Sequence, residues 1–197
     1  MPLTKPASLT PQTVRQHALS TLTDSFLENQ VGLIPIAQLC QALGQLCIPL
    51  AGRRIAELRA SGDAADSHEE VMAELELCIG LVFKPLRHHI QNIVNEGTED
   101  LMLVWVPILD VMKEVFNESI SENGTHENGQ GAAGIIKSSN ELALEYLRNI
   151  ITVLIDYNVL QAEPSQRDDM TALTWDAVAE MNYCKDFLEE WKQAAGQ

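Results

Sequence analysis

The sequence predicts an all-α protein, built as an irregular HEAT-like or armadillo-like antiparallel array of about six helices. Three observations support this fold class. Apolar residues recur three and four positions apart along several long segments, which is the spacing of one helix face. Aromatic residues make up only 5% of the chain, so aliphatic residues dominate the apolar fraction. Prolines lie within the helical segments, as they do in helical-repeat solenoids. No sequence period is visible, but we favour an open array over a closed bundle.

The helical pattern occurs in six segments. We expect helices at residues 11–29, 35–59, 67–97, 98–116, 138–158 and 171–191. Thr10 and Pro11 give the first of them an N-cap and a proline at its first position. An S-x-x-E capping box is expected to open the third helix at Ser67 and the fifth helix at Ser138.

Glycine, asparagine and proline mark where these helices end or change direction. We expect Gly97 to end the third helix and Asn158 to end the fifth. Pro49, Pro85 and Pro107 lie inside the second, third and fourth helices. An interior proline lacks a backbone N–H and clashes with the preceding turn, so we expect a kink or a break at each of them.

The helices are expected to form a single helical-repeat domain over residues 10–197, preceded by a flexible tail at 1–9. Between the fourth and fifth helices, the glycine-rich polar sequence at 117–137 has no helical periodicity and predicts a mobile acidic loop. A second polar stretch, at 162–170, predicts a linker before the last helix.

The chain is acidic, with a formal net charge of −15. Its first 60 residues carry five basic and three acidic residues, and the rest carries eight basic and 25 acidic residues. Because an acidic surface repels a phosphate backbone, nucleic acid is not an expected partner. No apolar run approaches the roughly 20 residues needed to cross a bilayer, so we expect any membrane contact to be peripheral.

No catalytic motif is recognisable in the sequence. Phosphate-binding loops, zinc-protease motifs and nucleophile elbows are absent, and we expect no catalytic site, no metal and no cofactor. His88 and His89 are adjacent, so on a helix they would point about 100° apart and could not share a metal ion. The four cysteines lack metal-site spacing and predict buried, reduced thiols: Cys40, Cys47, Cys78 and Cys184.

Two further groups of residues predict structure rather than chemistry. A solvated helix face is expected for the acidic group Glu69, Glu70, Glu74 and Glu76. Packing into helix interfaces is expected for the tryptophans Trp105, Trp175 and Trp191.

A basic cluster in this acidic chain is the one candidate contact site. Arg53, Arg54 and Arg59 lie at the end of the second expected helix. They could contact an anionic lipid or an acidic partner. Cations near a helix C-terminus also interact favourably with the helix dipole, and this accounts for the three arginines at least as well.

Three blocks in the C-terminal half carry a family resemblance. They are LMLVWVPILDVMKEVF at 101–116, NELALEYLRNIITVLIDYNVLQ at 140–161 and ALTWDAVAEM at 172–181. In this order they resemble the last helical region of the large Golgi-type Arf guanine-nucleotide exchange factors, downstream of the Sec7 domain. The family's proline-bearing step after the third block is replaced here by residues 181–184, Met-Asn-Tyr-Cys.

The resemblance covers roughly residues 68–192 and implies structural roles for the residues that match the family motifs. These residues are Trp105, Pro107, Leu109, Asp110, Glu141, Leu147, Arg148, Asn149, Thr174 and Trp175. No catalytic role is carried over, because the exchange activity of the family belongs to the Sec7 domain, which these residues do not contain.

The resemblance implies a non-catalytic regulatory or targeting scaffold in Golgi vesicle-mediated transport, cytoplasmic and peripheral to Golgi membranes. Its implied partners are an Arf-type small GTPase, Golgi proteins or other domains of the same parent protein, with peripheral contact to an anionic membrane as a further candidate. The alternative is a helical-repeat adaptor or tether of another intracellular complex. The sequence leaves open the oligomeric state and whether Met1 is a native start.

Overall fold

The computed structural model describes residues 10–28, 34–60, 68–117, 129–160 and 169–195, and this part of the chain contains helices and no strand. The α-helices are α1 (Pro11–Leu27), α2 (Ile36–Ala42), α3 (Ile48–Ala60), α4 (His68–Glu96), α5 (Thr98–Asn117), α6 (Gly129–Asp156), α7 (Asp169–Glu180) and α8 (Lys185–Ala195). The predicted all-α fold is confirmed. The described helices outnumber the six expected because two expected helices are each divided.

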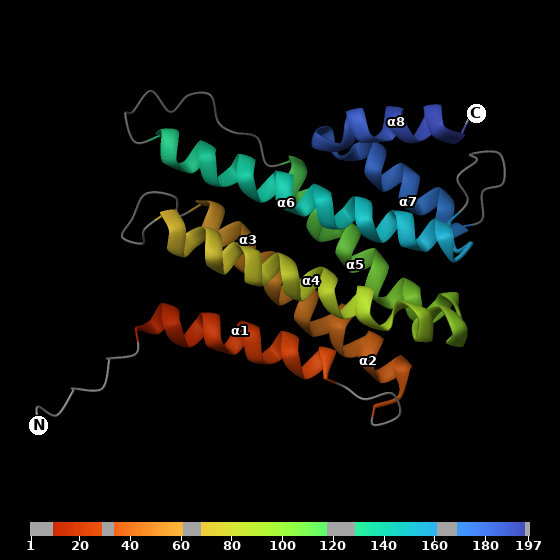
Figure 1. Ribbon diagram of the computed structural model, residues 1–197, viewed down its shortest axis with the longest axis horizontal. Coiled ribbons are helices and arrows are strands. Elements are labelled where there is room, and N and C mark those ends of the chain that lie inside the picture. Colours follow the sequence, from red (N-terminus) through yellow and green to blue (C-terminus); the bar gives the residue numbers. More distant parts are fainter. Residues whose placement is uncertain (1–9, 29–33, 61–67, 118–128, 161–168, 196–197) are drawn as a thin grey trace, which may run out of the picture.

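The helices form two packed layers. Figure 1 shows α1, α4 and α6 side by side in the nearer layer, with α3 and α5 behind α4. Within the second layer α5 packs against α2 and α3 on one side and against α7 on the other. α4 lies at the centre, in contact with α1, α3, α5 and α6. This is the expected helix array, in which each hairpin buries its apolar faces against the next.

The second expected helix is divided by a π-helical turn, η1 (Leu43–Cys47), between α2 and α3. The N–H of Ile48 donates to the carbonyl of Leu43, one residue further back than in an α-helix. The turn ends two residues before Pro49, whose ring would otherwise crowd the carbonyl one turn earlier. In contrast, α4 and α5 each continue as one helix through Pro85 and Pro107.

The predicted bounds of the loop at 117–137 are wrong at both ends. Asn117 is the last residue of α5, and α6 already begins at Gly129. Ser138 therefore lies inside a helix, and the capping box expected there does not form. Burial of Ile135, which is 3% exposed, favours continuation of the helix towards its N-terminus despite the glycines. Residues 118–128 lie outside the described part of the chain.

The last expected helix is also divided, into α7 and α8, with a 3-10 turn, η3 (Asn182–Cys184), between them. Met181 has an extended backbone and a fully buried side chain, so the chain changes direction to keep this residue in the core. The break falls where the sequence departs from the family pattern. The last two residues of the linker expected at 162–170 are helical, because α7 begins at Asp169.

Three residues expected to cap or end helices, Thr10, Gly97 and Asn158, lie where the sequence predicts. Gly97, with φ of 143°, and Asn158, with φ of 56°, follow the last residues of α4 and α6, as expected for left-handed helix-ending positions. The Thr10 side chain accepts a hydrogen bond from the Thr13 N–H at 3.2 Å and caps α1. The expected tail at 1–9 and the capping residue Ser67 lie outside the described residues.

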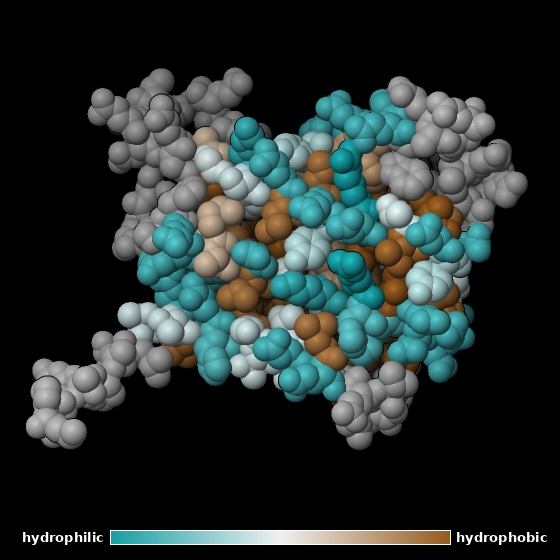
Figure 2. Space-filling view, in the orientation of Figure 1, coloured by the Kyte–Doolittle hydropathy of each residue, from teal (hydrophilic) through white to brown (hydrophobic). Residues whose placement is uncertain are grey.

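The surface of the nearer layer is mostly polar. Figure 2 shows hydrophilic side chains over much of this face, with apolar side chains between the helices. Among the helices built from described residues, none combines the length and apolar character needed to cross a membrane.

Candidate docking groove

Two glycines, Gly44 in η1 and Gly52 in α3, face α5 and allow it to pack closely against both segments. A Cβ atom on Gly44 would lie 1.8 Å from the carbonyl oxygen of Leu103, and one on Gly52 would lie 2.6 Å from Val111 Cγ2. The two contacts advance along both helices in the same direction. The helices therefore run parallel, and the line of close contact at the two glycines forms a seam between them.

A groove follows this seam. It consists of two adjoining hollows of about 410 and 320 Å³, which share Gly52, Val111 and Glu114. Its apolar lining includes Ile55 and Ala56. Every described lining residue comes from η1, α3 or α5. The groove is thus a surface between two helices of one layer, suited to holding an elongated ligand.

Charged residues form the rims of the groove. Arg53 is exposed on the α3 rim, and Asp110 and Glu114 are exposed on the α5 rim. At one end Arg59 is 3% exposed, and its Nη1 donates to the carbonyl oxygen of Val115 at 2.7 Å. An apolar floor between charged rims can bind and orient a ligand.

The basic cluster expected from the sequence does not form one surface. Arg54 Nε donates to Glu74 Oε1 at 2.8 Å, and its Nη1 donates to Glu57 Oε2 at 2.9 Å. The hydrogen bond to Glu74 is the main cause that raises the pKa of Arg54. Because Arg54 is ion-paired and Arg59 is buried, only Arg53 is placed as an outward contact residue.

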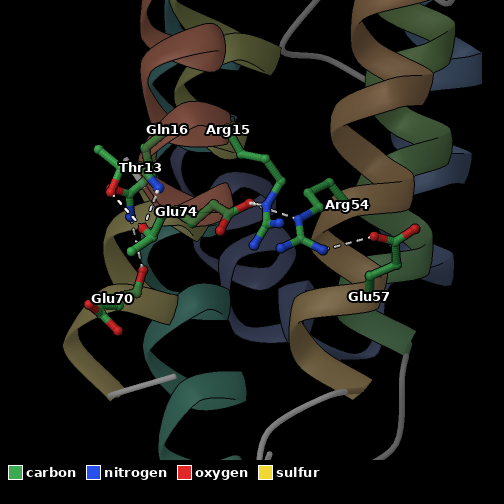
Figure 3. Close-up of polar contacts among 8 residues, drawn as sticks. Thr13, Arg15, Gln16, Arg54, Glu57, Glu70 and Glu74 are labelled. Atoms are coloured by element: carbon green, nitrogen blue, oxygen red, sulfur yellow. Dashed lines mark hydrogen bonds and ion pairs between the residues drawn. The ribbon is translucent and has the colours of Figure 1, made fainter. Parts of the chain in front are cut away.

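The expectation of a solvated face for the acidic group in α4 is wrong for Glu74. Glu74 is fully buried, and Figure 3 shows its carboxylate facing both Arg15 and Arg54; Arg15 Nε lies 3.4 Å from Glu74 Oε1. A signal was available, since Glu74 falls three residues after Val71 and four before Cys78, on the apolar stripe of the helix. The exposed positions Glu69, Glu70 and Glu76 fit the expectation.

The first and third family blocks meet inside the protein. Trp105 is fully buried, and its Nε1 donates to Thr174 Oγ1 at 2.8 Å. The same hydroxyl donates to the carbonyl oxygen of Met170 at 2.8 Å. Trp175 is buried as well. These residues join α5 to α7, so their role in this structure is packing.

The remaining motif residues are distributed over the fold. Leu109 and Leu147 belong to the core, whereas Pro107 and Asp110 line the groove. Arg148 lies over the Phe187 ring, 5.0 Å from its centroid, and pairs with Glu190, which fastens α8 to α6.

Two motif residues in α6 lie on its outer face. Glu141 is exposed, with a long contact of 3.9 Å to Lys137, and Asn149 is exposed. The groove is lined by two motif residues, Pro107 and Asp110, and by two arginines of the expected basic cluster, Arg53 and Arg59.

The cysteines are buried free thiols, as expected. Burial raises the pKa of the Cys40, Cys78 and Cys184 thiols to about 12, so they stay protonated at neutral pH. His89 is also buried, and its Nε2 donates to the carbonyl oxygen of Phe26 at 2.7 Å. No cluster of three metal-ligating side chains occurs within the described ranges.

Comparison with known proteins gives one match. A family model described as the GBF1-like, tetratrico peptide repeat region matches residues 3–182. No curated protein and no solved structure matches the chain. The matched range includes both walls of the groove, the buried ion-pair network and the contact between Trp105 and Thr174.

Proposed function

Because this chain belongs to the GBF1-like tetratricopeptide repeat family, we propose that it is a non-catalytic regulatory or targeting scaffold of a large Arf guanine-nucleotide exchange factor in Golgi vesicle-mediated transport. The observation that carries this proposal is the match over residues 3–182, which takes in nearly the whole array of helices. Its expected location is the cytoplasmic side of Golgi membranes.

The structure supports a scaffold because its polar groups are used to join helices. Glu74 joins α4 to α1 and α3 through arginines, Trp105 joins α5 to α7, and Arg148 joins α6 to α8. The groove between α3 and α5 supplies a surface for a protein partner. Helical arrays with such surfaces act by holding partners together.

Two measurements test the proposal. The first follows GDP release from an Arf-type GTPase by a GBF1-type Sec7 domain on liposomes, alone and fused to this chain. The chain by itself should leave GDP release at its intrinsic rate, and the fusion should change the rate of the Sec7 domain. The second follows a fluorescent fusion of the chain in cells, which should concentrate at the Golgi.

The two arms separate the two parts of the proposal. Acceleration of GDP release by the isolated chain would refute the non-catalytic assignment. An unchanged Sec7 rate together with a diffuse cellular signal would refute both regulation and targeting.

A further inference from the structure

The groove between α3 and α5 is about as long as a short helix. Its α5 wall runs from Pro107 to Asn117, which is about 15 Å at about 1.5 Å per residue. Outside the lining residues, each wall segment carries an exposed leucine. Leu103 is 42% exposed and lies one turn before Pro107, and Leu46 is 68% exposed and lies three residues before Pro49 on the opposite wall.

The floor of the groove is apolar and can receive one face of an amphipathic ligand. Gly52 and Val111 are buried in the floor, and the small side chain of Ala56 is exposed to it. A partner with branched aliphatic residues at helical spacing would remove this floor and the two exposed leucines from water.

The charges on the rims favour a partner of positive charge. Asp110 and Glu114 lie one turn apart on the exposed α5 rim, and among the described residues that line the groove Arg53 is the exposed cation opposite them. The chain as a whole carries a net charge of −15. This field attracts a cationic segment and repels an anionic membrane. A second copy of the chain would bring the same negative charge, so it is disfavoured as the occupant.

We propose that the groove binds a basic amphipathic helix of a protein partner, with its aliphatic face on the floor and its Lys or Arg residues against Asp110 and Glu114. This inference rests on the proposed scaffold function and specifies the class of partner that the scaffold holds.

The test uses a labelled peptide of about 14 residues, or about four helical turns, with leucines on one face and lysines along one edge of that face. Its affinity for the chain is measured by fluorescence anisotropy at physiological salt. A peptide of the same composition in scrambled order, which has no apolar face, is the ligand control. The amphipathic peptide should bind at least about tenfold more tightly than the scrambled one.

Two double variants separate the effect of the rim charges on peptide binding from the effect of the net charge. Asp110→Lys with Glu114→Lys reverses the rim, and Glu76→Lys with Glu145→Lys reverses exposed acids on α4 and α6. Each acid-to-lysine change adds two charges, so both variants go from −15 to −11. The rim variant should weaken peptide binding about tenfold, and the control should stay within about twofold of the wild type.

A third variant tests the floor. Ala56→Trp places a large ring in the groove at an exposed position, and it should weaken peptide binding about tenfold. Equal weakening by the two charge variants, or equal binding of the scrambled peptide, would overturn the proposal. So would a concentration-dependent dimer that Ala56→Trp abolishes, since the groove would then bind a second copy. Golgi localisation without peptide binding would retain the scaffold function and reject this inference.

Discussion

At the scale of single residues, the buried carboxylate of Glu74 links three helices. It is fully buried in α4 and pairs with Arg54 of α3 and Arg15 of α1. The net contribution of a buried ion pair is small, because both charges lose their hydration when they are buried. Removing one partner is costly, because the other charge stays desolvated without its counter-ion.

Glu74→Gln should therefore destabilise the protein by about 3 kcal/mol, although it conserves the size of the side chain. Urea unfolding followed by circular dichroism measures the change. Glu57→Gln is the matched control, since Glu57 also pairs with Arg54 but its side chain is 64% exposed. It should cost at most about 1 kcal/mol. Equal losses for the two variants would mean that the burial of Glu74 has no energetic role.

At the scale of helices, local sequence signals predicted most element ends. Thr10, Gly97 and Asn158 act through their own backbone or side chain, so a reader of the sequence can place them. The start of α6 and the break after α7 depend instead on burial of Ile135 and Met181 in a core made by other helices. Such tertiary effects override local propensity.

The groove could not be predicted from the sequence, because it too depends on tertiary packing. Arg53 and Asp110 are far apart in the chain and meet only because Gly44 and Gly52 allow α5 to approach. A glycine in a helical pattern predicts a weak point of the helix and does not identify its packing partner. The burial of Arg59 likewise depends on the position of Val115 in α5.

Gly44→Ala tests this close approach. The added methyl group would meet the backbone carbonyl of Leu103 at 1.8 Å, and because a backbone carbonyl cannot rotate away, α5 must shift. We expect a loss of about 2–3 kcal/mol in the free energy of unfolding. The control is Gly80→Ala in α4, where the methyl group would meet only the flexible Lys84 side chain at 3.2 Å.

The control should have the opposite sign. Alanine favours the helix over glycine, so Gly80→Ala should stabilise the protein by about 0.5–1 kcal/mol. Urea unfolding under identical conditions compares the two variants. A neutral or stabilising Gly44→Ala would show that the two helices are not held at this distance.

At the scale of the whole molecule, stability is unevenly distributed because each helix packs mainly on its neighbours. α5 buries nine residues between helices of both layers, whereas the buried residue of α1 is Thr23. α1 packs chiefly on α4, with polar links from Arg15 to Glu74 and from the Phe26 carbonyl to His89. In such arrays terminal elements open at a lower free energy than central ones.

Amide hydrogen exchange should reveal this gradient. The amides of α5 should exchange only through global unfolding, and those of α1 should exchange at least about 100-fold faster, since α1 can detach while α4 and α5 stay packed. Glu74→Gln removes the charged link to Arg15, so it should accelerate exchange in α1 more than its global destabilisation explains. The comparison is made by mass spectrometry of peptides from both helices, with Glu57→Gln as the control. If α1 and α5 exchange together in every variant, the array unfolds as one cooperative unit and nearest-neighbour packing does not govern its stability.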